Sequence, residues 1–125
     1  MIFDTHAHYD DEAFDEDREA LLASLKEAGI GAVTNVGASL ESCRTTLKLA
    51  EAYPWMYGAL GVHPSESKDV KEEDMEWLAG LLRHEKIRAV GEIGLDYYWE
   101  EPNHEIQKKW FVRQLDLARQ AGLPV

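Results

Sequence analysis

The sequence predicts an α/β fold in which helices cover a parallel sheet. Two observations carry this prediction. Short apolar segments typical of strands alternate strictly with segments whose apolar residues recur at helical spacing, and this unit occurs four times. Such an order is expected where crossover helices join parallel strands. At 125 residues, 45% of them hydrophobic, the chain has the length of one domain and enough apolar residues to form a core.

Each of the four units consists of one strand followed by one helix. The strands are expected over residues 2–6, 30–36, 56–62 and 87–93. The helices are expected over residues 15–28, 39–50, 71–83 and 103–121. We expect Gly29 to end the first helix, Ser39 to cap the second, and Gly122 and Pro124 to end the fourth.

Charge and composition restrict the possible partners and the compartment. The chain carries 24 acidic and 13 basic residues, a formal net charge of -11, which opposes non-specific adhesion to nucleic acid or to anionic membranes. A polyanionic substrate would therefore need a local positive centre, such as a bound metal ion. No apolar run reaches the roughly 20 residues of a membrane helix, and Asp4 and His6 interrupt the N-terminus too early for a signal peptide. We expect a cytoplasmic protein without a membrane partner, in which the lone Cys43 packs as a small apolar residue.

Polar side chains stand near the carboxyl ends of all four expected strands. His6 and His8 are two residues apart at the end of the first, and because side chains alternate across a strand, both imidazoles can bind one metal ion. The other polar residues expected on this face are Asp4, Asn35, His63 and Glu92, in front of an interior formed by Ile2, Val33, Ala59, Gly61 and Val90. Because ligands bind at the carboxyl edge of parallel sheets and barrels, the sequence predicts an active site there.

Structural alternatives exist for several of these residues. His63, which precedes Pro64, can cap the third strand, and Asn35 can stabilise a turn. Glu92 can be a buried carboxylate paired with a basic side chain, because an unpaired one would be too costly to bury. Asp96 can anchor a loop. The aromatic run 97–99 can either line a substrate groove, where it would stack on bases or sugars, or cover the mouth of the core.

Taken together, these motifs resemble the TatD family of metal-dependent hydrolases. The resemblance rests on Asp4-Thr5-His6-Ala7-His8, Gly61-Val62-His63-Pro64, Gly91-Glu92-Ile93-Gly94-Leu95-Asp96-Tyr97, Gln107-Lys108-Lys109-Trp110-Phe111 with Leu115, and Leu123-Pro124-Val125. It implies a TIM (β/α)₈ barrel of the amidohydrolase-like type. Because such a barrel needs about 250 residues, residues 1–125 would form the N-terminal half of one barrel domain, with its first four βα units.

The resemblance also implies an activity and a set of site residues. It implies two divalent metal ions (Mg, Mn, Zn or Ni) and 3′ to 5′ exonuclease cleavage of phosphodiester bonds in DNA, on single strands or 3′ ends. His6 and His8 would bind one metal, and Glu92 would bridge to the second. His63 would face the substrate phosphate and act with Glu92 in catalysis. Asp96 and Tyr97 are the further substrate-binding residues we expect.

The family pattern continues beyond Leu123-Pro124-Val125 with further His and Asp residues. We therefore expect the 125-residue chain to be inactive alone, and either to associate with a complementary half-barrel or to self-associate. Two alternatives remain open. One is another metal-dependent hydrolase on the same scaffold, a phosphoesterase or a D-aminoacyl-tRNA deacylase. The other is a half-barrel that serves as a non-enzymatic assembly module.

Overall fold

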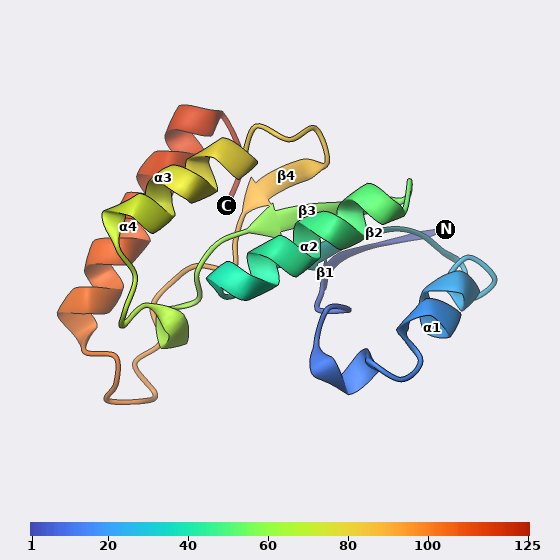
Figure 1. Cartoon of the computed structure of the whole chain (residues 1–125), viewed down its shortest axis with the longest axis horizontal. Coiled ribbons are helices and arrows are strands. Elements are labelled where there is room, and N and C mark those ends of the chain that lie inside the picture. The colour runs from blue at the N-terminus through green and yellow to red at the C-terminus, as the bar shows by residue number, and fades with distance from the viewer.

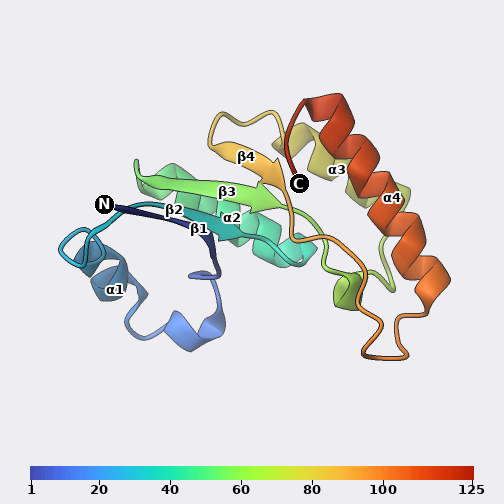
Figure 2. The ribbon, with the colours of Figure 1, turned by 180° about the vertical axis from the view of Figure 1, so that it is seen from behind.

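A computed structural model describes all 125 residues as a four-stranded parallel sheet with helices. The strands are β1 (Ile2–Ala7), β2 (Ile30–Val36), β3 (Met56–Leu60) and β4 (Ile87–Val90), and they are paired in that order. The helices are α1 (Arg18–Ser24), α2 (Leu40–Ala52), α3 (Glu72–Leu81) and α4 (His104–Ala121), with short 3₁₀ turns η1 (Glu12–Phe14) and η2 (Pro64–Glu66). In Figure 1, α2 lies in front of the strands, and in Figure 2, from behind, the strands lie in front of it. The predicted α/β order is therefore confirmed.

Several predicted boundaries are too wide. The first helix was expected over residues 15–28, but α1 ends at Ser24. There the hydrogen-bond pattern changes, because the Leu25 amide donates to the carbonyl three residues back, that of Leu22, at 3.4 Å. The turn continues to Gly29, whose φ of 88° ends it, as expected for glycine. β3 ends at Leu60 because the Val62 amide leaves the sheet ladder and donates to a side chain of α4. β4 likewise ends at Val90 instead of residue 93.

The caps of the two longest helices follow the sequence. The Ser39 hydroxyl accepts the amide of Ser42 at the start of α2, and Gly122 ends α4 with a φ of 67°. On α2, Cys43 is fully buried, and its thiol donates to the Gly61 carbonyl at 3.3 Å. Burial raises the pKa of Cys43 to about 12, because it disfavours the charged thiolate. The prediction that this cysteine packs as a small apolar residue is confirmed.

The core lies between the sheet and the helices. Its larger cluster joins β3 and β4 to α2, α3 and α4. In its smaller cluster, Leu22 of α1 and Leu25, which directly follows α1, pack against β2 and β3. None of the helices combines the length and the apolar composition that crossing a membrane requires.

The predicted facing of several strand residues is wrong. Val33 is fully buried, but in the cluster beneath α1, on the face opposite to the one predicted, whereas Val90 is fully buried and borders both the larger cluster and the hollow on the open face. Ile2 is 59% exposed because β1 is an edge strand with one neighbour. The alternation does not extend from Val90 to Glu92, since β4 ends between them and the backbone leaves the ladder. Of the predicted interior, Ala59 does line the hollow on the open face of the sheet.

Two buried glutamines of α4 fix the connections that leave the carboxyl edge of the sheet. Gln114 accepts the Val62 amide at 2.7 Å and donates to the Val62 carbonyl at 3.2 Å. Gln107 accepts the Asp96 amide and donates to the carbonyls of Asp96 and Pro102. Each side chain therefore replaces the backbone partners that these segments lose when they leave the sheet.

Replacing Gln114 by alanine should destabilise the fold. Gln114→Ala leaves the buried amide and carbonyl of Val62 without their partner, which costs about 1–3 kcal/mol. Urea denaturation followed by circular dichroism measures this as a lower midpoint. The matched control is Gln120→Ala on the same helix, where the lost bond to Asp116 is exposed and the change should stay below about 0.5 kcal/mol. Equal midpoints for the two variants would show that the Gln114 contacts contribute nothing.

Candidate metal centre

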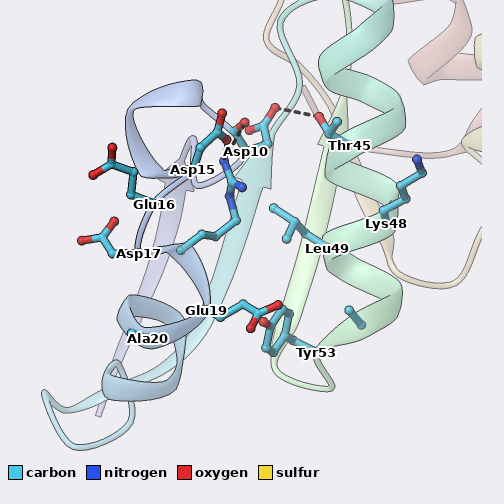
Figure 3. A pocket seen from close by; sticks show the side chains of 12 residues that line it. Asp10, Asp15, Glu16, Asp17, Glu19, Ala20, Thr45, Lys48, Leu49 and Tyr53 are labelled. Carbon is cyan, nitrogen blue, oxygen red and sulfur yellow. Dashed lines mark hydrogen bonds and ion pairs between the residues drawn. The ribbon is translucent and has the colours of Figure 1, made fainter.

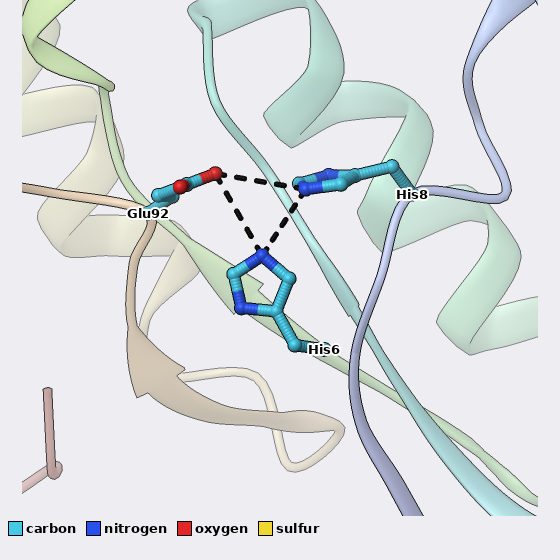
Figure 4. A group of neighbouring side chains, drawn as sticks. All are labelled: His6, His8 and Glu92. Carbon is cyan, nitrogen blue, oxygen red and sulfur yellow. Dashed lines mark hydrogen bonds and ion pairs between the residues drawn. The ribbon is translucent and has the colours of Figure 1, made fainter.

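Three of the predicted site residues come together at the carboxyl edge of the sheet. His6 and His8 extend from the end of β1, and Glu92 follows β4 (Figure 4). The Nε2 atoms of the two histidines are 3.1 Å apart, and the Glu92 Oε2 atom lies 3.8 Å from His6 Nε2 and 3.6 Å from His8 Nε2. No lysine or arginine of this chain forms an ion pair with Glu92, and the basic side chains nearest to it are the two histidines.

The three ligand atoms have the spacing of a metal site. A point equidistant from all three lies about 2 Å from each, which matches the lengths of Zn–N and Zn–O bonds. The two contacts of Glu92 are too long to be hydrogen bonds. Imidazole and carboxylate together suit zinc, manganese or nickel. The donor set and its geometry therefore fit one divalent cation.

The hydrogen bonding of His8 selects the tautomer that can bind a metal. Its Nδ1 lies 2.8 Å from the carbonyl oxygen of Val36, at the end of β2. Because a carbonyl only accepts, Nδ1 must carry the proton, which leaves the lone pair of Nε2 directed at the candidate centre. Second partners of this kind are usual for metal-binding histidines.

The same end of β2 holds the other two strand-end residues. The Gly37 carbonyl accepts the amide of Glu92 at 2.6 Å, and the Ala38 carbonyl accepts the amide of His63 at 2.8 Å. Three consecutive carbonyls, those of residues 36–38, therefore hold the His8 ring, the Glu92 backbone and the His63 backbone. Sequence reasoning missed these groups because backbone acceptors leave no mark in residue identity.

Gly61 permits the close approach of the segment that carries Glu92. A Cβ atom at position 61 would lie 2.8 Å from both the Gly91 carbonyl carbon and the Ile93 Cγ2 atom. The Gly91 amide then donates to the Leu60 carbonyl at 2.9 Å. Close packing against Gly91 and Ile93 therefore explains the glycine in the Gly61-Val62-His63-Pro64 string.

The prediction that Asn35 faces the site is wrong, and its amide instead supports the loop after His8. Asn35 is fully buried; its Oδ1 accepts the Tyr9 amide at 2.6 Å, while its Nδ2 donates to Asp10 and to Thr46 of α2. Its amide group therefore forms all its hydrogen bonds on the face covered by the helices, and it stabilises the turn after β1, as the structural alternative predicted.

Asp4 was also expected on the site face and is not among the converging groups. It is paired in register with Val33, a residue of the core beneath α1, and its carboxylate accepts the His6 amide at 3.1 Å. The register of β1 and β2 is irregular between Asp4 and Ala7, so simple alternation does not extend from Asp4 to His6.

His63 lies at the neighbouring strand end but outside the three-residue group. Its Nδ1 accepts the Ser65 amide at 3.1 Å and lies 2.8 Å from the Ser65 hydroxyl, which caps the η2 turn. His63 therefore caps the η2 turn rather than the third strand, and it uses only one ring nitrogen to do so. Since a backbone amide only donates, neutral His63 carries its proton on Nε2, where it can donate to a ligand.

Asp96 and Tyr97 lie farther along the loop that follows Glu92. The Asp96 carboxylate accepts the Tyr98 amide at 3.0 Å, so it anchors the loop, as the structural alternative predicted. Tyr97 stacks on His104 with ring centroids 3.7 Å apart. The alternative in which the aromatic run covers the core is wrong, because Tyr98 and Trp99 are 82% and 60% exposed.

A second hollow lies between α1 and α2 and does not resemble a ligand site. Figure 3 shows its acidic side chains spread along α1 and the preceding loop. Arg18 pairs with Asp15 at 2.7 Å, and Asp10 accepts the Thr45 hydroxyl at 2.9 Å. Arg18, Asp15, Asp10 and Thr45 are therefore engaged in contacts within the protein.

The fold and the centre together define a class of protein. A parallel βα sheet that brings two histidines from one strand end and a glutamate from another to its carboxyl edge is the arrangement of metal-dependent hydrolases on a TIM barrel, of which this chain contains four βα units. A family model described as TatD related DNase matches residues 3–125. The chain belongs to the TatD family.

Known proteins are similar along the whole of this chain. The metal-dependent hydrolase YabD of Bacillus subtilis is 38% identical over 125 residues, which cover 100% of this chain and 49% of YabD. The exonuclease TatD of Cronobacter sakazakii, named for 3′-5′ activity on ssDNA and RNA, is 30% identical over 99% of this chain and 47% of its own length. The crystal structure of YjjV, a TatD homologue from Escherichia coli, superposes with a TM-score of 0.90 at 37% identity, covering 99% of this chain and 49% of YjjV. The chain spans about half the length of these relatives.

Replacing Gly61 by alanine should weaken metal binding. In Gly61→Ala the new methyl group pushes against the Gly91 backbone and the Ile93 side chain on either side of Glu92. We expect this to move Glu92 away from the histidines and to lower the affinity for Mn²⁺ by about tenfold. Isothermal titration calorimetry measures this. Gly80→Ala is the control, because a Cβ there meets nothing within 4 Å and should stabilise α3 by about 0.5–1 kcal/mol without changing metal affinity. Unchanged affinity in Gly61→Ala would contradict this role of the glycine.

Proposed function

We propose that this chain forms the N-terminal half of a TatD-type barrel that hydrolyses phosphodiester bonds of single-stranded DNA from the 3′ end with two divalent metal ions. The observation that carries the proposal is the convergence of His6, His8 and Glu92 at metal-ligand spacing on the carboxyl edge of the sheet. The family of the chain and the exonuclease name of its Cronobacter relative support the reaction class. The phosphoesterase, deacylase and non-enzymatic assembly alternatives predict other outcomes of the tests below.

Each residue of the centre has a distinct part in this proposal. A bound pair of divalent ions would supply a nucleophile from water at neutral pH and stabilise the charge that develops on the phosphate. His6 and His8 hold one ion through neutral Nε2 atoms, and the Val36 carbonyl keeps the His8 ring in place. Glu92 would contribute the negative charge that the two imidazoles lack and would also help to hold the second ion.

His63 supplies a hydrogen-bond donor to the substrate. Its Nδ1 is engaged by the Ser65 amide, which leaves Nε2–H for a phosphate oxygen. The ring is held at the end of β3 by the bond from its own amide to Ala38. Asp96 acts on the substrate indirectly, because its carboxylate shapes the loop that carries Tyr97. Tyr97 is 46% exposed, so its ring offers an aromatic surface on the loop that follows Glu92.

The charge of the chain agrees with metal-assisted binding of the substrate. With a formal net charge of -11, the protein surface repels a polyanion on average. Attraction at the scissile phosphate must then come from the divalent ions rather than from a basic surface.

Removing His6 should weaken metal binding and hydrolysis together. We expect His6→Ala to lower the affinity for Mn²⁺ on the order of 100-fold, because two ligands cannot replace three. Calorimetry measures the affinity of the chain. Hydrolysis is measured on a 3′-labelled single-stranded oligonucleotide, with the chain alone and mixed with the half of YabD that it does not match. His84→Ala, at a histidine paired with Glu51 away from the centre, should bind metal normally.

The substrates in this assay separate the candidate functions. Cleavage of the single strand in the mixture, and its loss in His6→Ala, is the expected result. Preferential hydrolysis of a phosphomonoester or of a D-aminoacyl ester would favour the other hydrolases on this scaffold. Metal-independent association of the two halves without any hydrolysis would favour the assembly module and contradict the proposed function.

Replacing His63 should separate substrate binding from metal binding. In His63→Ala we expect unchanged affinity for Mn²⁺, and turnover in the YabD-half mixture reduced on the order of 100-fold, because a donor to the phosphate is lost. Ser65→Ala removes the hydroxyl partner of the ring but keeps the amide bond to Nδ1, so its effect should be less than tenfold. Loss of metal binding in His63→Ala would mean that His63 is a ligand instead.

A further inference from the structure

The loop between β4 and α4 presents a pair of aromatic side chains to solvent. Tyr98 is 82% exposed and Trp99 is 60% exposed, and their rings meet edge to face with centroids 4.7 Å apart. No other part of the chain covers them. Large aromatic rings are costly to leave in water, so two adjacent exposed rings mark a surface that binds something.

The base of this loop is rigid, which holds the two rings in a defined place. Gln107 fixes both backbone groups of Asp96 and the Pro102 carbonyl from the buried side of α4. The Asp96 carboxylate accepts the Tyr98 amide, and Tyr97 stacks on His104 with an interplanar angle of 17°. The backbone that carries the rings is therefore held in place, which limits the conformational entropy lost when a flat ligand stacks on them.

The position of the pair relates it to the candidate metal centre. Both residues follow Glu92 in the same loop, at the carboxyl edge where His6, His8 and His63 also lie. In both views of the ribbon the loop extends from the end of β4 past the sheet and reaches the neighbourhood of η2, the turn that begins after His63 (Figures 1 and 2). A linear ligand bound at the metal centre would reach the two rings if it followed this loop.

The charges around the pair restrict what it can bind. Glu100, Glu101 and Glu105 surround it in sequence, and Lys108 is already paired with Glu105 at 3.1 Å. This environment does not attract phosphates or an anionic membrane. Unpaired nucleobases stack on aromatic rings without needing a positive charge, whereas the bases of a duplex are stacked on one another and offer no free face.

We infer that Tyr98 and Trp99 form a stacking platform for unpaired nucleobases of a strand whose phosphate lies at the metal centre, and that this platform selects single strands over duplexes. The inference rests on the proposed function for the direction of the strand. The stacking energy on which the platform depends is independent of the proposed function, because stacking requires no hydrolysis. The rings touch bases and not the scissile bond, so they determine specificity and affinity.

The test is binding of a short, labelled oligodeoxyadenylate to the chain, followed by fluorescence anisotropy. We expect Tyr98→Ala with Trp99→Ala to weaken binding by about 10- to 100-fold, which is the range for one to two lost stacking contacts. A strand of the same length built from abasic units, with the same phosphates, should bind wild type as weakly as the double variant binds the natural strand. A duplex of the same sequence should bind both proteins equally weakly.

Val112→Ala is the matched control, because Val112 is an apolar side chain on α4 with 62% exposure and should leave binding unchanged. Equal affinity of wild type and double variant, or equal affinity for natural and abasic strands, would overturn the platform. Absence of any binding by wild type would overturn it too. If the double variant instead changes only the sedimentation coefficient of the chain, the rings form a contact between copies and the inference is wrong.

The platform and the proposed function fail in different ways. Repeating the titration with His6→Ala removes the metal centre but leaves both rings, so the contribution of the rings should persist. If that contribution persists but no metal-dependent hydrolysis is found, the proposed function fails alone. If hydrolysis and metal binding hold but the double variant retains full affinity and its preference for single strands, only the platform fails.

Discussion

The candidate centre depends on the carbonyl groups at the carboxyl end of β2. Val36 ends β2, which is paired on both sides, by β1 and by β3, and Gly37 directly after it donates its amide to the Ala59 carbonyl at 2.9 Å, so main-chain pairing rather than side-chain rotamers directs these carbonyls. The three acceptors serve residues from three different strand ends: His8 after β1, His63 after β3 and Glu92 after β4. The ligands are thus positioned by main-chain geometry, which varies little and loses little entropy when a cation binds.

Helix α4 extends this order to the loops. Its apolar face carries two amide side chains among core residues such as Trp110 and Leu117, and these amides reach the backbone on either side of the centre. One holds the residue that precedes His63, and the other holds the loop that follows Glu92. Because both amides belong to one rigid helix, the two loops cannot shift independently. A buried amide costs stability unless its hydrogen bonds are made. These two amides make theirs with the backbone of the two loops, and their role is therefore to hold the loops in place.

The sequence predicted the fold and the three converging residues because both follow from local patterns. Alternation of strands and helices fixes a parallel sheet, and a parallel sheet places His6, His8 and Glu92 at one edge. The facing of Asn35 could not be predicted, since alternation tells which residues share a face but not which face meets the helices. A polar residue at a strand end was assumed to face the ligand, whereas Asn35 is satisfied by Tyr9, Asp10 and α2. The backbone acceptors and the close contact at Gly61 depend on tertiary approach and are invisible in sequence.

The distribution of charge explains why an acidic chain can carry a site for a polyanion. Coulomb attraction from a basic surface is long-ranged and indifferent to base sequence or strandedness. A surface with a net charge of -11 loses that attraction, so only short-range contacts can hold a nucleic acid. In the proposed site these are a divalent cation at one phosphate, a single donor from His63, and the exposed rings of Tyr98 and Trp99. All three act at short range, and the rings act only where bases are free, so a site of this kind would obtain its selectivity from these contacts rather than from general attraction to nucleic acid.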